Sequence, residues 1–195
     1  MIIDETYFVR RLNLPQKGNP EGLAEILSFI EQYEAEYLQC VLGRELWQAF
    51  TDGTDGSGIP AQRWADLLDG KDFTYKKCMH NWTGFKPDDK LSPIANYVYY
   101  QYVDNKIAEF VLTGVVVSST DKNRTVAATY RLVDAWNRMV DMNKDLYRFL
   151  KQNQVIYPEW KLCYTVESCG CGCGCDKCAP VGCGRFFEKI NSLDL

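Results

Sequence analysis

The residues best suited to chemistry are cysteines gathered near the end of the chain. Six of the nine cysteines lie in the stretch SCGCGCGCDKCAPVGCG: Cys169, Cys171, Cys173, Cys175, Cys178 and Cys183. The glycines between them permit the tight backbone turns that let several thiolates converge on one point. Cys175 and Cys178 have the C-x-x-C spacing that wraps a chain around zinc.

One interpretation of this tail is a closed tetrahedral zinc site of four thiolates, because a reducing cytoplasm favours metal over disulfides. Its ligands would be Cys175, Cys178 and Cys183, with Cys169 or Cys171 as the fourth. Disulfides formed after the protein leaves the cell, and free thiols in a loop, are the alternatives. Redox catalysis is disfavoured, because the C-x-x-C pair does not precede a helix in a β-α-β unit.

The single histidine, His80, limits the acid-base chemistry that this chain can perform near neutral pH. No nucleophile elbow, phosphate loop or paired metal-binding helix surrounds it in the sequence. Cys78 lies two residues earlier, but the local sequence supplies no further ligands for a metal. We therefore expect His80 to lie in or beside a β-turn, and we expect the protein not to be an enzyme.

Length and composition indicate one globular domain with an appendage. The chain has 195 residues, of which 46% are hydrophobic and 25% charged. Its formal charge of -4 argues against free-standing affinity for nucleic acid, because phosphate binding is driven by Lys and Arg that displace counterions. No apolar stretch approaches the roughly 18 to 20 residues that cross a bilayer. We expect a protein made in the cytoplasm, with no membrane partner.

The elements that position these groups are organised around residues 92–114. Ser92 is a good N-cap, Pro93 suits the first helical turn, and Gly114 is a natural stop. The apolar and tyrosine side chains between these ends cover several faces: Ile94, Tyr97, Val98, Tyr100, Tyr102, Ile107 and Val111. The stretch predicts a central helix with neighbours on several sides, and Tyr97 and Val98 are expected in the core.

Two further long helices are predicted to pack against the central one. Apolar residues three and four apart predict a helix over residues 21–50, bent near Gly43. Its acidic residues are expected on a solvated or partner-facing surface: Glu25, Glu31, Glu34 and Glu36. Residues 126–152 predict the other helix, whose core stripe is Leu132, Trp136, Met139, Leu146 and Leu150, with Asn143 in the seam.

Shorter elements lie between and beyond these helices. A short helix is expected over residues 60–68, and two aromatic-rich strands, 73–77 and 81–85, predict a small β-hairpin within about residues 71–86. The run Val115, Val116 and Val117, followed by Ser118 and Ser119, would be exposed in a compact monomer. We interpret residues 115–123 as an arm that pairs with another chain.

The combined prediction is a mainly α fold, in which a bundle of three to four helices carries a small β-hairpin insertion and extended arms. Residues 1–20 would form an N-terminal arm, of which residues 1–8 are either an arm or an edge strand. Residues 21–156 would form the helical domain. Residues 157–195 would form an extended, cysteine-rich tail.

Several segments together resemble a known group of proteins. They are YEAEYLQCVLGRELWQAF (33–50), IPAQRWADLLDG (59–70), WTGF (82–85), SPIANYVYYQY (92–102), AWNRMV (135–140) and LYRFL (146–150). They resemble an uncharacterised family carried by phages and prophages of gut Bacteroides-type bacteria. That family is similar to the head-tail connector, or neck adaptor, proteins of tailed phages. The resemblance covers roughly residues 21–152 and rests on core-type aromatics and glycines.

The resemblance implies a helical bundle that assembles as a ring, commonly of about twelve copies, between portal and tail. The implied partners are the chain itself, the portal protein, the tail or neck proteins, and DNA that passes through the lumen without sequence-specific binding. The implied location is the neck of the virion, and the family offers no catalytic residues. The cysteine tail matches no adaptor pattern, so the alternative function is a zinc-binding regulatory or nucleic-acid-binding module built on that tail.

Overall fold

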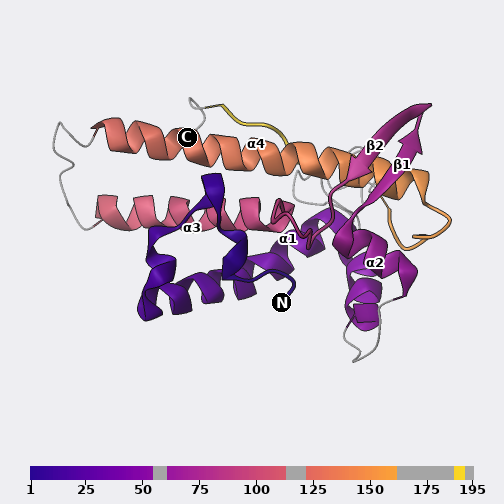
Figure 1. Cartoon of the computed structure of the whole chain (residues 1–195), viewed down its shortest axis with the longest axis horizontal. Helices are drawn as coiled ribbons and strands as arrows, with labels where there is room; N and C mark the ends of the chain where they lie inside the picture. The colour runs from indigo at the N-terminus through magenta and orange to yellow at the C-terminus, as the bar shows by residue number, and fades with distance from the viewer. Residues whose placement is uncertain (55–60, 113–121, 162–186, 192–195) are drawn as a thin grey trace, which may run out of the picture.

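The computed structural model is mainly helical and describes residues 1–54, 61–112, 122–161 and 187–191. Four α-helices are present in these ranges: α1 (Pro20–Thr54), α2 (Gln62–Asp69), α3 (Pro93–Leu112) and α4 (Lys122–Gln152). Strands β1 (Lys71–Tyr75) and β2 (Cys78–Trp82) form one antiparallel hairpin between α2 and α3 (Figure 1). The predicted helical bundle with a hairpin insertion is confirmed.

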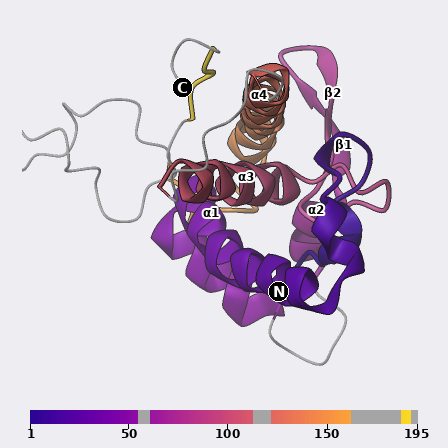
Figure 2. The same ribbon diagram turned by 90° about the vertical axis from the view of Figure 1, so that its left-hand side faces the viewer.

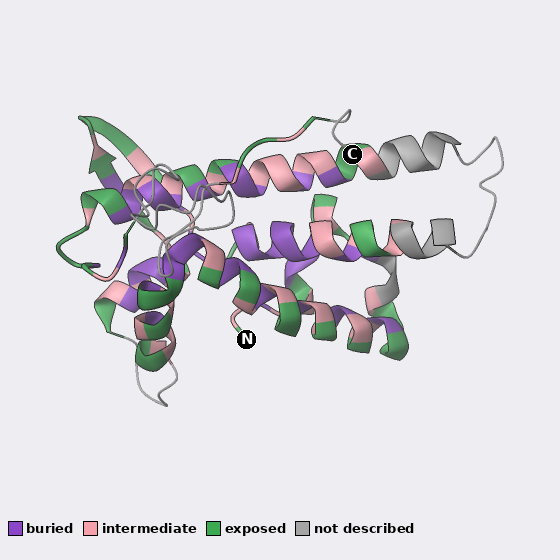
Figure 3. Ribbon diagram, turned by 180° about the vertical axis from the view of Figure 1, so that it is seen from behind, coloured by how far each residue is buried: buried purple, intermediate pink, exposed green. Residues whose placement is uncertain are grey.

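Helix α3 lies between α1 and α4, as the two perpendicular views show (Figures 1 and 2). Its start is set by Ser92, whose Oγ accepts a hydrogen bond from the Ile94 N–H at 3.2 Å and donates one to the Phe85 carbonyl oxygen at 2.7 Å. Every residue from Ser92 to Tyr99 is buried (Figure 3). The central position and the serine N-cap are therefore confirmed.

Helix α1 is interrupted at the glycine where the sequence predicts a bend. Gly43 has φ 74° and ψ 163°, a combination that is essentially restricted to glycine. Leu42 on one side of this break and Leu46 on the other are both fully buried. The break therefore turns α1 so that both of its halves face the core.

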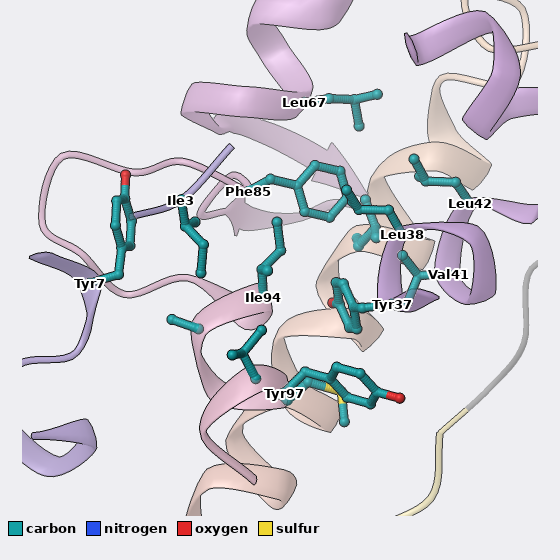
Figure 4. Close-up of a cluster of buried hydrophobic side chains, with 14 of the residues drawn as sticks. Ile3, Tyr7, Tyr37, Leu38, Val41, Leu42, Leu67, Phe85, Ile94 and Tyr97 are labelled. Atoms are coloured by element: carbon teal, nitrogen blue, oxygen red, sulfur yellow. The ribbon is translucent and has the colours of Figure 1, made fainter. Parts of the chain in front are cut away.

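One continuous hydrophobic core joins the three long helices, α2, the hairpin and the N-terminal residues (Figure 4). The predicted core residues Val98, Met139 and Leu146 are at most 1% exposed, and Tyr97 is 4% exposed. Trp136 is only partly buried, at the edge of this core. Asn143 lies in the seam as expected, where its Oδ1 accepts a hydrogen bond from the buried Tyr37 hydroxyl.

The hairpin begins earlier than the sequence predicts. Its strands cover residues 71–75 and 78–82, not 73–77 and 81–85, and Phe73 pairs with His80. The reversal is made by Lys76 and Lys77, which have φ 50° and 67°. A two-residue turn with positive φ at both positions usually carries Asn or Gly. A pair of lysines does not predict such a turn, so the sequence carried no local signal for its position.

The N-terminal residues are not an edge strand. They form short 3-10 helices at Glu5–Tyr7, Arg10–Leu12 and Pro15–Gly18. Ile3 and Phe8 are at most 1% exposed, and the Tyr7 hydroxyl donates to the Pro87 carbonyl oxygen at 3.2 Å. The segment predicted as an arm packs against the chain's own body, because its apolar residues complete the core.

The chain remains packed after α4 ends. Tyr157 and Trp160 are at most 3% exposed, and the Tyr157 hydroxyl donates to the Arg63 carbonyl oxygen at 2.6 Å. Lys161 forms an ion pair with Glu45 of α1 at 2.8 Å. Residues 157–161, predicted as the start of an extended tail, thus lie against the body. No helix in the described ranges is both long enough and apolar enough to span a membrane.

Candidate interaction surface

The predicted metal and arm residues lie outside the residues that the structure describes. These are Cys169, Cys171, Cys175, Cys178 and Cys183 of the tail, and Val115, Val116, Val117, Ser118 and Ser119 of the arm. Among the described residues, no group of three or more His, Cys, Asp and Glu side chains is placed to hold a metal ion. The zinc site and the arm therefore stay predictions.

His80 lies in strand β2 and helps to hold the hairpin against α4. Its ring stacks on Phe73, with centroids 5.7 Å apart, and Phe73 in turn contacts Phe149 of α4 edge-on at 5.5 Å. The His80 Nδ1 is 3.9 Å from the Asp145 carboxylate, also on α4. These contacts account for the histidine as a packing residue.

The most developed binding geometry belongs to the described C-terminal segment, residues 187–191, which lies along α4 (Figure 1, yellow). The residues that hold it come from all three long helices. We call them the docking surface: Tyr37 of α1, Tyr97 of α3, and Trp136, Asn137 and Asp141 of α4.

Phe187 inserts its ring among three aromatic side chains of the docking surface. Its centroid is 5.6 Å from that of Trp136, edge-on at 81°, and 6.1 Å from that of Tyr97. It stacks on Tyr37 at 6.3 Å. Each such pair contributes about 0.5 to 1.5 kcal/mol beyond the area that it buries. Phe187 is therefore the apolar anchor of the segment.

Side chains of α4 bind the backbone of the segment directly. The Asn137 Nδ2 donates to the Ile190 carbonyl oxygen at 2.9 Å, and the Asn137 Oδ1 accepts from the Ile190 N–H at 2.9 Å. The Trp136 Nε1 donates to the Glu188 carbonyl oxygen at 2.7 Å. Asn137 thus satisfies both backbone groups of one residue, as a neighbouring strand would, and this selects an extended segment.

A charge pair orients the segment. The Lys189 Nζ donates to the Asp141 carboxylate at 2.7 Å, and Asn137 and Asp141 are four positions apart, so they lie on the same face of α4. Burial acts to raise the pKa of the Asp141 carboxyl, but hydrogen bonds from Lys189 and Lys144 outweigh it and hold that pKa below its ordinary value. The carboxylate is charged at neutral pH and favours a basic residue at that point of the segment.

Of the four acids of α1 predicted on a solvated or partner-facing surface, Glu31 and Glu36 are exposed and Glu25 is partly exposed, but for Glu34 the prediction is wrong. Glu34 is 7% exposed, and its carboxylate accepts hydrogen bonds from the Ile2 N–H at 2.7 Å and the Ile3 N–H at 3.0 Å. The signal was present in the sequence, because position 34 falls on the core stripe between Ile30 and Tyr37.

Two other carboxylates of α1 accept hydrogen bonds from tyrosines of α3. Glu36 accepts from the Tyr97 hydroxyl at 2.7 Å, and Glu25 accepts from the Tyr102 hydroxyl at 3.1 Å. Burial, together with the bond to Glu36, raises the pKa of Tyr97 well above its ordinary value. These contacts fix Tyr97 in place as one wall of the docking surface.

The sequence did not single out Asn137, Asp141 or Phe187. The one signal in the chain was the return of aromatic and aliphatic residues, in RFFEKI, after the glycine-rich tail. What this arrangement can do is bind an extended peptide through an aromatic anchor, a basic side chain and backbone groups. Comparison of the chain with protein-family models, with curated proteins and with solved structures finds no match.

Proposed function

We propose that the protein is a structural head-tail connector, or neck adaptor, of a tailed phage virion. In this role it would form a ring, commonly of about twelve copies, between portal and tail around the DNA channel. The sequence support is the resemblance of residues 21–152 to such adaptors. The structural support is the docking surface, because a site that binds an extended segment is a common means by which the subunits of an assembly are joined.

The rest of the described structure suits a structural protein. Three long helices share one continuous core, and both ends of the described chain are held on this core by side-chain bonds to backbone, from Glu34 and from Asn137. A formal charge of -4 suits a ring whose lumen lets DNA slide, because the body as a whole does not attract phosphate. The function needs no catalytic residue, and His80 is accounted for by packing.

Electron microscopy of virions that contain this protein is the decisive experiment. We expect density for a ring of this chain between the portal and the tail, and we expect native mass spectrometry of the purified protein to show cyclic oligomers, alone or on portal rings. A protein that remains monomeric with its portal and tail partners present would overturn the proposal.

A second candidate function rests on the C-x-x-C pair of the tail. As a zinc-binding regulatory or nucleic-acid-binding module, the purified protein would carry stoichiometric zinc and bind DNA in a salt-sensitive manner. Replacement of Cys175 and Cys178 by serine would abolish both properties. Salt-sensitive DNA binding that is lost together with zinc would favour this candidate, because the connector requires neither property.

A further inference from the structure

We propose that the docking surface receives residues 187–191 from a neighbouring copy of the chain, so that adjacent subunits of the assembly exchange their C-terminal segments. This inference rests on the proposed ring, and it names the contact that would join its subunits. The occupant is a second copy, recognised by a phenylalanine anchor, a lysine two residues later and an extended backbone at Ile190.

The contacts themselves do not depend on which copy supplies the segment. They run from side chains of α1, α3 and α4 to the Phe187 ring, the Lys189 ammonium and the backbone of Glu188 and Ile190. The groups that the helices contact all belong to residues 187–191. A segment from another copy can therefore form the same set of bonds with the same geometry.

The chain between body and segment is far longer than docking on its own body requires. Lys161, the last described residue before this segment, pairs with Glu45 of α1, and Phe187 contacts Tyr37, eight positions earlier in the same helix and on the other side of its break at Gly43. Twenty-five residues lie between Lys161 and Phe187. Such a length reaches up to about 90 Å when extended, enough to cross to an adjacent subunit.

Mass action decides which copy's segment is bound. In an isolated chain the tether keeps the segment at millimolar effective concentration near its own docking surface, which favours the intramolecular contact. In the proposed ring, the 25 residues between Lys161 and Phe187 are long enough to let the segment reach a neighbour's docking surface as well. Each copy then gives one segment and receives one, which is a head-to-tail arrangement that can close into a ring. Each docking surface stays occupied, so no contact of the subunit is lost.

Two full-length variants test the exchange. The surface variant, Asn137→Asp, is isosteric and places a carboxylate oxygen against the Ile190 carbonyl in place of the donor. The segment variant, Phe187→Asp, removes the anchor and leaves the docking surface intact. Gln152→Glu is the matched control, because it makes the same amide-to-carboxylate change at an exposed residue of α4 outside the docking surface. Circular dichroism confirms that each variant is folded.

The variants are mixed, with one labelled by 15N, and the complexes are counted by native mass spectrometry. We expect mixed complexes at least tenfold more abundant than complexes of either variant alone, because only the mixture contains an intact segment opposite an intact, empty docking surface. The Gln152→Glu control should associate with itself as the native chain does. Mixed complexes no more abundant than those of single variants would overturn the exchange.

A charge-reversal pair provides an independent test. Asp141→Lys and Lys189→Asp each place like charges together within one chain, but a mixture offers matched charges at both crossed contacts. We expect the mixture to associate more strongly than either variant, and we expect the double variant D141K/K189D to behave as the native chain. Equal association of the mixture and the single variants would contradict exchange.

The outcomes separate this inference from the proposed function. If microscopy shows rings but the mixtures show no preference, the segment stays on its own body and the connector proposal stands. If the mixtures show exchange but virions show no ring of this chain, the exchange stands and the connector proposal falls.

Discussion

At the scale of single residues, the side chains of Glu34 and Asn137 bind the backbone near the two ends of the described chain. The Glu34 carboxylate accepts from the N–H groups of Ile2 and Ile3 and lies 3.7 Å from the N-terminal ammonium. At the other end of the described chain, the Asn137 side chain donates to the Ile190 carbonyl oxygen and accepts from the Ile190 N–H. Removing a polar side chain from water is costly unless it forms hydrogen bonds in the folded protein. The bonds of Glu34 and Asn137 meet this requirement and hold the bound backbone segments in one conformation.

Glu34→Ala is expected to destabilise the protein by about 1 to 3 kcal/mol, because the buried N–H groups of Ile2 and Ile3 lose their acceptor. The Glu34→Gln variant retains one acceptor oxygen and should lose less. Urea unfolding monitored by circular dichroism measures the change. Glu31→Ala, an exposed acid on the same helix, is the control and should change stability by no more than ~0.5 kcal/mol. A Glu34→Ala variant as stable as this control would contradict the role assigned to Glu34.

Buried tyrosines predict a loss of stability at alkaline pH. Burial raises the pKa of Tyr37, Tyr97, Tyr147 and Tyr157 above that of an exposed tyrosine. In the unfolded chain these tyrosines therefore ionise at a lower pH than in the folded protein. Their contribution to stability is complete below about pH 10, the pKa of an unfolded tyrosine, and is lost as the pH rises through the pKa values of the folded protein.

The urea midpoint should accordingly be steady from pH 8 to about 9.5 and fall at higher pH. Tyr157→Phe should weaken this fall, because one shifted group is removed. Tyr130→Phe is the control, since Tyr130 is 68% exposed, and it should leave the pH dependence unchanged. A midpoint that does not move between pH 9 and 11 would rule out the explanation.

At the scale of elements, breaks and turns decide how the helices meet. Gly43 divides α1 so that Tyr37, in the first half, lines the docking surface, while Glu45, in the second, holds Lys161. The Lys76-Lys77 turn orients the hairpin whose β1 strand packs Phe73 on α4. Both features are local backbone conformations with consequences for distant contacts.

Gly43→Ala should destabilise the protein by about 1 to 3 kcal/mol, because a Cβ is strained at φ 74°, ψ 163°. Thermal unfolding gives the measurement. The control is Gly18→Ala, since a Cβ added at Gly18 meets no atom within 4 Å. If both variants unfold at the same temperature, the break in α1 is not maintained by the special conformation of Gly43.

The double change Lys76→Asn with Lys77→Gly is expected to stabilise the hairpin by about 1 kcal/mol, because Asn-Gly adopts positive φ at both turn positions with little strain. Denaturant unfolding and hydrogen exchange of the β1 and β2 amides would show the gain. Slower exchange of these amides is the expected result; faster exchange would mean that the lysines make contacts that the turn depends on.

At the scale of the whole molecule, α3 is the element on which the others are assembled. It contacts both long helices, and Tyr97 joins the core, the Glu36 bond and the docking surface. Assembly, by contrast, is proposed to depend on residues 187–191 and on the run Val115, Val116 and Val117. Folding and assembly should therefore be separable by mutation.

Tyr97→Asp or Val98→Asp should prevent folding, because each places a charge at a position no more than 4% exposed. Deletion of Val115, Val116 and Val117 should leave the circular dichroism spectrum helical and impair ring assembly. Size-exclusion chromatography with light scattering measures the second effect. Intact rings after the deletion would show that this run is not an assembly arm.

The sequence by itself determined the helices, the cap at Ser92, the break at Gly43 and most of the core, because periodicity, capping and glycine conformation act within a few residues. It also predicted that Asn143 lies in the seam. The strand bounds were missed, since a Lys-Lys turn carries no strong local signal.

Only the tertiary structure decided the use of Glu34 and the docking of residues 187–191. Asn137 and Ile190 are 53 positions apart, and the aromatic anchor site needs three helices at once. No local pattern encodes such a contact, because its free energy arises from groups that become neighbours only after the bundle has formed. The docking surface is therefore a property of the packed bundle and not of any one segment of the sequence.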